Sequence, residues 1–479
     1  MASFTTDVAA IQPLSPSFDP DSYAVIDAIF DTLVSLDLDG RFLPGLATEW
    51  ERLTPTSWRF KLRRGVTFHN GEVMDAHAVK FTYDYVMNPA NNTGNAWILS
   101  SLKEVVVEDN YSVIIHTKFP DGLFLNRFHM FGSICPPGYI AEVGMEEFSR
   151  KPVGTGPFRW GRWKKGSYLE LERNPNYWRP DMPRVDRVRF VILPEEQWLD
   201  AFLKDEVDFL PNLVGNQTSR LMREAKGQAR ILKRLVLSGY CALLKNQGAL
   251  ADVRVRKALN YGLNRENLVR FADYGNGIAL ASLGKKEEFG SNPNLRKYIF
   301  DPNLARKLLK EAGVPNPLVL KAIVADIAGP VARVMKYDFE QIGVQLNLEI
   351  VSRADWARMV VDHKIKNGSP PDYDVAINLV DNPIHNLSFH AGLFLHSESP
   401  WALLNHPEFD RKFLDALQTV DQEDHRKRLE ALDAFIQDEA LMVFLSQRVL
   451  TAAVKPNLDV NLALNGHLGF LVLSTARFK

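Results

Sequence analysis

The stretch of chain from residue 46 to residue 85 restricts the fold more than any other part of the sequence. Trp58, Phe60 and Leu62 alternate with basic residues, and this period of two is typical of a half-buried strand. Gly65 then turns the chain, and a second short strand begins at Val66. We expect the two strands to pair with each other as a ribbon.

A helix is predicted directly after this ribbon. Asp75 stands at the position of a helix N-cap, and Val79, Tyr83 and Val86 follow at helical spacing. The predicted helix runs from about residue 76 to residue 87 and has one apolar stripe. The stretch is therefore a compact unit of two strands and a helix.

A second informative stretch runs from Lys151 to Trp178. Gly154 and Gly156 bracket Thr155, which indicates a constrained loop whose backbone passes close to some other group. The loop lacks the lysine and hydroxyl residue of a phosphate-binding P-loop, and no helical pattern follows it. We therefore interpret it as a structural turn between subdomains.

Both stretches resemble the signature of the family 5 extracellular solute-binding proteins, the peptide-, nickel- and oligosaccharide-binding receptors of ABC importers. A third motif, at residues 252–268, is similar to that family as well, and the three motifs stand in the expected order. The letters that carry the resemblance are Leu46-Ala47, Trp50, residues 58–63, Gly65-Val66, Phe68-His69, Gly71, residues 152–158, Asn174-Pro175, Tyr177-Trp178, Asp252, Val255-Arg256, Ala258-Leu259, Leu263-Asn264-Arg265 and Leu268.

Length and charge narrow the classes of function. A chain of 479 residues exceeds what one hydrophobic core normally supports, so two or more domains are expected. Its 57 lysines and arginines nearly balance its 58 aspartates and glutamates, which gives no reason to propose nucleic acid or an anionic membrane as a partner. No apolar run predicts membrane insertion. Cys135 and Cys241 are the only cysteines, and we expect two buried thiols, with a single disulfide between them as the alternative.

The resemblance implies an α/β, two-lobed fold like that of the periplasmic binding proteins of type II, cluster C. We expect lobe I at residues 1–236, with an extra subdomain inserted at about 37–153. Lobe II is expected at residues 237–449, and the chain is expected to return to lobe I at residues 450–479.

The second half of the chain has the alternation of strands and helices that favours parallel pairing. Strands are predicted at residues 318–324, 345–351 and 374–379, with a helix at 330–341 between the first two. Near the N-terminus, apolar residues at helical spacing predict a helix from Tyr23 to Leu36.

The implied function is that of the substrate-binding component of an ABC importer. Two lobes that rotate about crossovers near Leu237 and Leu450 capture a peptide or peptide-like solute and deliver it to the permease subunits. No catalytic motif is present, so we expect neither an enzyme nor a cofactor. The alternatives are a binder of a non-peptide ligand, such as a metal chelate or an oligosaccharide, and a cytoplasmic ligand-sensing domain of a regulator.

The resemblance also implies a periplasmic protein, which we expect to be a monomer. The first residues of the sequence lack the basic and apolar regions of a signal peptide. We interpret this start as that of a mature or truncated chain.

Six residues are predicted to contact the ligand. In peptide-binding members of the family an aspartate after the buried strand of the second lobe pairs with the peptide's α-ammonium, and the resemblance places this role on Asp381, with Asn382 beside it. An Asx turn before Pro383 is the alternative for Asp381. The candidate wall residues are Phe389, Trp401, Trp97 and Phe131, although large aromatic side chains are also common in cores.

Two further features bear on the ligand. Dipeptide-selective members of the family tend to have an arginine, which binds the ligand carboxylate, in the loop before the second-lobe helix. The corresponding loop here, at residues 324–330, has no basic residue, which disfavours a free dipeptide as the ligand. His385, His390, His396 and His406 are close in sequence, but their spacing matches no metal-ligand motif, so we expect no metal site.

Overall fold

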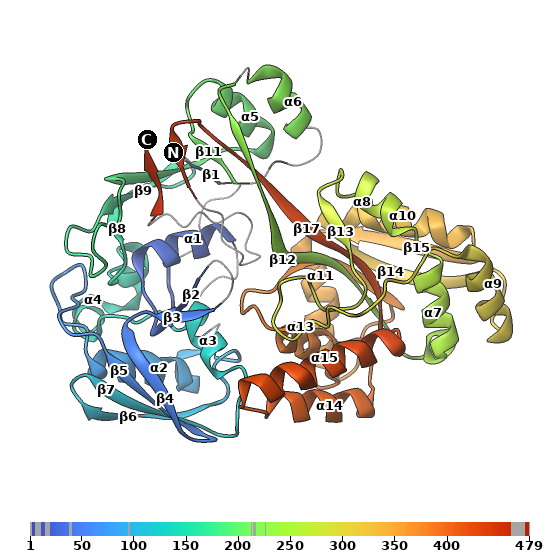
Figure 1. Cartoon of the computed structure of the whole chain (residues 1–479), viewed down its shortest axis with the longest axis horizontal. Coiled ribbons are helices and arrows are strands. Elements are labelled where there is room, and N and C mark those ends of the chain that lie inside the picture. Colours follow the sequence, from blue (N-terminus) through green and yellow to red (C-terminus); the bar gives the residue numbers. More distant parts are fainter. Residues whose placement is uncertain are drawn as a thin grey trace. The chain divides into compact units, whose positions relative to one another are not determined.

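The computed structural model describes residues 2–4, 11–14, 20–37, 41–93, 96–211, 213, 217–225, 227–460 and 475–478. The chain divides into two compact units of α/β structure (Figure 1). Unit 1 comprises Met1–Arg234 and Leu450–Lys479, and unit 2 comprises Leu235–Val449. Among the described residues, no helix has both the length and the apolar character that crossing a membrane requires.

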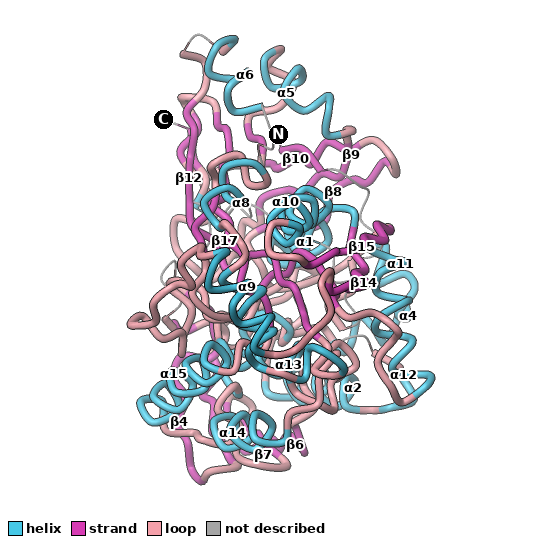
Figure 2. Tube along the Cα trace, turned by 90° about the vertical axis from the view of Figure 1, so that its right-hand side faces the viewer, coloured by secondary structure: helices cyan, strands magenta, loops and turns pink. Residues whose placement is uncertain are grey.

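Unit 2 is built on a sheet in which three strands run parallel. β14 (Leu318–Ala325) pairs in parallel with β15 (Val344–Val351) along its whole length and with β16 (Val375–Asp381) on its other side. The next strands in the sheet are β12 (Arg230–Leu244), which is antiparallel to β16, and β17 (Met442–Val454). The three strands predicted for this region are confirmed, and β14 and β15 lie side by side in both Figure 1 and Figure 2.

Helices pack on both faces of this sheet because its strands are apolar on both sides. Ala322 and Val324 of β14 contribute to one apolar cluster, whereas Ile323 and Ala325 contribute to the other. The first cluster is covered by α7 (Val253–Tyr261), α8 (Arg265–Phe271), α9 (Pro302–Glu311) and α10 (Gly329–Glu340). The second is covered by α11 (Arg353–Ala357), α13 (Leu387–Leu395), α14 (Pro407–Leu417) and α15 (Gln422–Asp438).

Three short elements complete unit 2. Strand β13 (Gly277–Ala279) pairs with β17. A π-helical turn over Arg358–Asp362 continues from α11 into α12 (His363–Asn367).

Unit 1 contains a mixed sheet and a separate antiparallel sheet. In the mixed sheet, β1 (Ala2–Phe4) lies between and parallel to β10 (Arg187–Ile192) and β11 (Phe209–Leu210). β9 (Tyr168–Arg173) and β8 (Phe158–Lys164) extend it beyond β10, and α5 (Glu195–Leu203) and α6 (Gln217–Glu224) follow in the chain.

The antiparallel sheet has the order β4 (Ala47–Thr54), β5 (Ser57–Leu62), β7 (Ser112–Thr117) and β6 (Leu102–Asp109). The helices of this region are α2 (Ala76–Met87), α3 (Phe124–Phe131) and α4 (Pro137–Arg150). Whether this part is a subdomain inserted at residues 37–153 stays a prediction. The remaining elements of unit 1 are α1 (Pro20–Ile29), β2 (Val34–Leu36), β3 (Phe42–Pro44), β18 (Leu458–Asp459) and β19 (Arg477–Phe478).

The helix predicted after the first motif is confirmed, but the ribbon is wrong. The Asp75 side chain accepts hydrogen bonds from the backbone of His77 and Ala78 and so caps α2. β5, however, pairs with β4 and β7, which occupy both of its edges. The segment after Gly65 is left with a single bridge, between Thr67 and Val73.

The helix predicted from Tyr23 to Leu36 is also wrong at its C-terminal end, because α1 ends at Ile29. The backbone N–H of Gly156 donates to the Ile29 carbonyl at 2.8 Å. A methyl group at either Gly154 or Gly156 would overlap the backbone at Ile29. The prediction that the backbone of this glycine loop passes close to some other group is therefore confirmed, and its partner is the end of α1.

Asp31, two residues beyond α1, accepts hydrogen bonds from several residues of the second motif. Its carboxylate accepts hydrogen bonds from the Thr155 hydroxyl (2.9 Å), the Trp178 indole N–H (2.9 Å) and the Tyr177 hydroxyl (3.1 Å). Burial raises the pKa of Asp31, and the three donors together with Arg179 oppose that shift. The motif residues thus serve the architecture of unit 1.

The two cysteines are both free and buried, as predicted. Burial raises the pKa of each thiol, so neither is an activated nucleophile.

Candidate functional site

The parallel strands of unit 2 end at Ala325, Val351 and Asp381. In open α/β sheets, ligands bind outside the carboxyl ends of such strands. Asp381 is the last residue of β16. The fold therefore places at this edge of the sheet the side-chain carboxylate that we predict to bind the ligand. It faces Ser238 of β12 across the antiparallel pair.

One oxygen of the Asp381 carboxylate lacks a hydrogen-bond donor in the described part of the chain. Its Oδ1 atom is buried and accepts no hydrogen bond from the described residues. Burial raises the pKa of Asp381, while the neighbouring Ser238 hydroxyl and the charges of Arg448, Arg353 and Lys285 oppose that rise. A buried carboxylate oxygen without a donor is an energetic liability that a ligand cation would relieve.

Lys285 and His390 connect to the backbone of Asp381. The Lys285 ammonium donates to His390 Nδ1 at 2.9 Å, and His390 Nε2 lies 3.0 Å from the Asp381 carbonyl oxygen. Lys285 is 2% exposed and His390 is fully buried. Burial, together with the adjacent lysine, holds the pKa of His390 well below its ordinary value, so the imidazole is neutral.

Asn382 is buried and its side chain is fully engaged within the loop. Its amide N–H groups donate to the Glu288 carboxylate and to the Asn386 carbonyl (2.8 Å), and its amide oxygen accepts from the Ile384 backbone at 3.2 Å. Its own backbone N–H donates to Leu237 at 2.9 Å. The structure therefore places Asn382 as a brace of the loop that carries Asp381.

The aromatic candidates of unit 2 lie in two settings. Phe389 is on α13, half-buried, with its ring 5.6 Å from the His390 ring. Trp401 packs on the second apolar cluster, 5.5 Å from Trp356 and 6.2 Å from Phe394. Phe389 is thus close to the Asp381 loop, while Trp401 belongs to the packing around α13.

The two candidates of unit 1 differ in exposure. Trp97 is 50% exposed, which is unusual for so large an apolar side chain. Phe131 is 4% exposed and its ring packs edge-on against Tyr23 at 5.8 Å. Phe131 therefore occupies a core position.

The histidines that are close in sequence have separate roles. His390 bonds Lys285, His396 packs against Phe413 with ring centroids 5.3 Å apart, and the His406 imidazole caps α14. His385 is buried, with a φ of 57°. The described residues contain no group of three or more histidine, cysteine, aspartate or glutamate side chains that could hold a metal ion.

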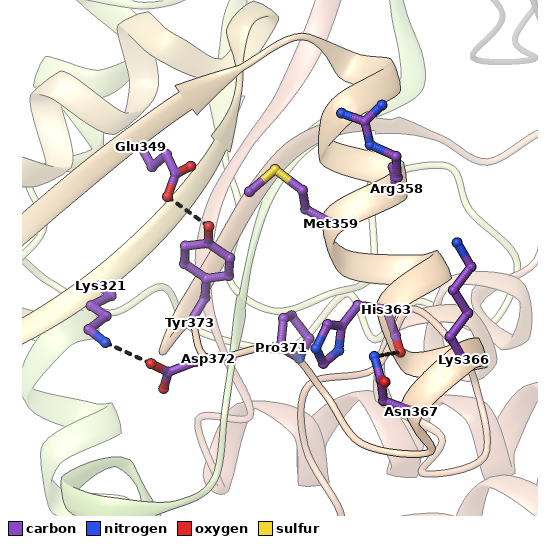
Figure 3. A pocket seen from close by; sticks show the side chains of 10 residues that line it. All are labelled: Lys321, Glu349, Arg358, Met359, His363, Lys366, Asn367, Pro371, Asp372 and Tyr373. Atoms are coloured by element: carbon purple, nitrogen blue, oxygen red, sulfur yellow. Dashed lines mark hydrogen bonds and ion pairs between the residues drawn. The ribbon is translucent and has the colours of Figure 1, made fainter.

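A hollow of about 570 Å³ lies elsewhere in unit 2, and Figure 3 shows the ten residues that line it. Its acidic groups already have partners: Lys321 binds Asp372 at 2.7 Å, and the Tyr373 hydroxyl donates to Glu349 at 2.7 Å. None of the six predicted ligand residues is among those ten. The Asp381 loop is therefore the stronger candidate site.

Sequence reasoning missed Lys285, Arg353 and Arg448. Arg353 lies two residues beyond the carboxyl end of β15, and the rule that ligands bind at such strand ends was a signal that could have identified it. Lys285 lies in a loop without regular structure, and its contact with His390 joins residues 105 positions apart. No local pattern predicts that contact.

Comparison with known proteins places the chain in a large group. The sequence model of the family described as bacterial extracellular solute-binding proteins, family 5 Middle, matches residues 41–378. The glutathione-binding protein GsiB of Pectobacterium atrosepticum is 24% identical over 443 residues, covering 90% of this chain and 85% of that protein. The GsiB protein of Escherichia coli O1:K1 is 27% identical over 305 residues, which cover 62% of this chain and only 58% of that protein.

Solved structures share the fold over the whole chain. The ABC transporter substrate binding protein CtaP of Listeria monocytogenes has a TM-score of 0.88 at 21% identity, covering 100% of this chain and 98% of that one. The periplasmic binding protein DppA of Helicobacter pylori, in complex with the peptide STSA, has a TM-score of 0.82 at 21% identity, covering 100% and 97%. The expected two-lobed periplasmic-binding-protein fold is thereby confirmed.

Proposed function

We propose that this chain, which belongs to the family 5 bacterial extracellular solute-binding proteins, binds a peptide through the Asp381 carboxylate of unit 2. Its membership of that family makes it the substrate-binding component of an ABC importer and not an enzyme. Delivery of the solute to permease subunits, from the periplasm and by a monomer, is part of the proposal. Rotation of two lobes about residues near Leu237 and Leu450 stays a prediction.

The observation that carries the proposal is the unsatisfied oxygen of Asp381. Oδ1 is buried and without a donor among the described residues, at the end of a parallel strand where ligands bind in this class of fold. An α-ammonium group supplies both the positive charge and the hydrogen-bond donors that this oxygen needs. A peptide amino terminus therefore fits the site.

Two arginines favour a peptide that also carries carboxylates. Arg353 of α11 and Arg448 of β17 both act electrostatically on Asp381, which places positive charge on two elements near it. The loop at residues 324–330 offers no partner for a carboxylate of the ligand. The positive charges of Arg353 and Arg448 can bind such a carboxylate instead. Glutathione has one ammonium and two carboxylates, and relatives at 24% and 27% identity are named for binding it. It is the first ligand to test.

We assign different roles to the other predicted residues. Phe389 and the exposed Trp97 are proposed as wall residues that contact the ligand, and Asn382 as the brace of the Asp381 loop. For Trp401 and Phe131, packing contacts support a role in holding the surrounding structure.

The direct test is isothermal titration calorimetry of the full chain with glutathione, with the dipeptide Met-Leu and with the peptide STSA. We expect at least one to bind, and Asp381→Asn to weaken that binding by about 100-fold, since it removes one partner of a buried charge pair. Asp372→Asn, which alters a paired surface carboxylate in the hollow of Figure 3, is the matched control and should bind as the wild type does. Equal binding by Asp381→Asn and the wild type would reject the proposal.

A further inference from the structure

The strongest unexplained feature of unit 2 is a buried lysine that faces an imidazole in place of a carboxylate. Lys285 is 2% exposed, and buried ammonium groups normally pair with an acid. Its Nζ instead lies 2.9 Å from His390 Nδ1. The Asp381 carboxylate is close enough to feel the lysine charge, yet it makes no hydrogen bond to the lysine.

The protonation state of His390 follows from its two partners. An ammonium can only donate hydrogen bonds, so Nδ1 must accept, and the ring proton must be on Nε2. That proton points to the Asp381 carbonyl oxygen, 3.0 Å away. His390 therefore lies as a neutral spacer between the lysine and the backbone of Asp381.

The same lysine is braced through its backbone. The Lys285 N–H donates to Glu288 at 2.9 Å, and Glu288 in turn accepts from Asn382, the residue after Asp381. These hydrogen bonds, together with the peptide bond between Asp381 and Asn382, close a ring through Lys285, His390, Asp381, Asn382 and Glu288. The ring fixes the Lys285 ammonium relative to the backbone of Asp381, the residue that carries the carboxylate.

We propose that His390 is a positioning residue that holds the Lys285 ammonium away from the Asp381 carboxylate, so that the lysine balances the charge of the carboxylate without occupying the oxygen that a ligand ammonium takes. This inference rests on the proposed role of Asp381. It explains why the buried Lys285 does not pair directly with the nearby Asp381, whose Oδ1 atom is buried. In this arrangement the site is ready for an external cation.

The other groups that face Asp381 do not replace this arrangement. Ser238 approaches from β12, Arg448 from β17 and Arg353 from α11, and each favours the ionised carboxylate. Lys285 differs from the two arginines because its ammonium is held within the ring by an imidazole. Removal of the imidazole frees the lysine to form an ion pair with Asp381.

The test uses glutathione binding to the full chain, measured by calorimetry at pH 7.5. His390→Leu should bind about 10-fold or more weakly, because the released lysine competes for the carboxylate. His390→Gln keeps one acceptor and one donor and should stay within about 3-fold of the wild type. The double variant Lys285→Met with His390→Leu should bind several-fold more tightly than His390→Leu alone, because the competing cation is gone.

The recovery of affinity in the double variant distinguishes a positioning role of His390 from simple structural support. If His390 only supported the fold, removing a second buried polar group would not restore affinity. A double variant that binds no better than His390→Leu overturns the proposal, and so does wild-type affinity in His390→Leu. His396→Leu, at the end of the same helix α13, is the control and should bind as the wild type does.

Two further measurements keep the test decisive. If His390→Leu fails to fold by circular dichroism, His390→Gln decides, and a 10-fold loss of affinity in His390→Gln overturns the proposal. In Lys285→Met, affinity should fall more steeply than in the wild type as the pH is lowered from 8 to 6, because Asp381 loses a neighbouring positive charge that keeps it ionised.

If Asp381→Asn binds normally, the proposed function fails. If Asp381→Asn binds weakly while His390→Leu binds normally, only the positioning role fails.

Discussion

Asp31 of unit 1 and Asp381 of unit 2 are both carboxylates whose pKa values burial raises, but they differ in what surrounds them. Asp31 accepts three side-chain hydrogen bonds from Thr155, Tyr177 and Trp178. Asp381 has a buried oxygen without any such bond among the described residues. A satisfied carboxylate stabilises the fold, whereas an unsatisfied one costs stability and is available to a ligand.

The same contrast explains why the motif residues differ from the residues proposed to bind the ligand. The second motif of the sequence supplies the donors to Asp31 and the glycines that approach Ile29. The groups around Asp381 come from β12, β17, α11 and the loop that contains Lys285. A resemblance based on the motif therefore identifies the architecture more firmly than it identifies the ligand.

The largest effect on stability is expected at Asp31. Asp31→Ala leaves the buried Thr155 hydroxyl and the half-buried Tyr177 and Trp178 donors without an acceptor, and it should lower the free energy of unfolding by about 4 kcal/mol. Urea denaturation followed by circular dichroism measures this loss. Glutathione affinity of the folded fraction should not change. A loss below about 1 kcal/mol would mean that Asp31 is not the structural counterpart of Asp381.

Gly156→Ala should lower the free energy of unfolding by less than Asp31→Ala does. The added methyl group would overlap the backbone at Ile29, so the loop or the end of α1 must shift, at a cost of about 3 kcal/mol. Gly329→Ala is the matched control, since a methyl group there meets only the ends of the Arg333 and Ile350 side chains, at 3.6 Å or more. The control should unfold as the wild type does or at slightly higher urea. Equal effects of the two substitutions would contradict the close approach.

His69 should make unit 1 sensitive to acid. Burial lowers the pKa of His69 to about 4, and its imidazole lies between the Gly156 carbonyl (3.0 Å) and the Gly154 N–H (3.3 Å). Between pH 6.5 and pH 4 the unfolded chain binds a proton that the folded chain does not, so stability falls as the pH is lowered, by up to about 3 kcal/mol. The difference between the wild type and His69→Gln in urea midpoints across this range isolates the contribution. A pH-independent difference would show that His69 titrates normally.

The smallest effect on stability is expected at Asp381. Asp381→Asn removes a buried charge whose Oδ1 has no donor among the described residues, so the free energy of unfolding should change by less than about 1 kcal/mol, or rise. Thermal unfolding without ligand measures this. A large loss would place Asp381 with Asp31 as a structural residue and would remove the contrast between them.

Local patterns predicted the elements that depend on local rules. Asp75 and the apolar stripe after it predicted α2, and the apolar runs predicted β14, β15 and β16. The wrong ribbon followed from treating adjacent strands as partners, although β5 takes its partners from residues 47–54 and 112–117. That pairing was inferred from the turn at Gly65 and from proximity along the chain, and neither determines which strands pair in the sheet.

The surroundings of Asp381 were less predictable, because they too depend on contacts between residues far apart in the sequence. Asp381 came from the family resemblance, and its surroundings did not. Lys285 and His390 are in contact across 105 positions, and the hydrogen bond from Asn382 to Glu288, which with the one to Asn386 supports the proposed role of Asn382 as a brace, also joins residues far apart in the sequence. Burial also separates Phe131 from Trp97, which the sequence presents as equal aromatic candidates. Each of these outcomes depends on tertiary contacts.

The most direct test of the account compares glutathione with N-acetylglutathione on the wild type and on Asp381→Asn. Acetylation removes the ammonium, so it should weaken wild-type binding by about 100-fold and change the affinity of Asp381→Asn by less than about 3-fold. This pattern would locate the ammonium at Asp381. Equal wild-type affinity for both compounds, or the same loss on acetylation in both proteins, would contradict the central claim.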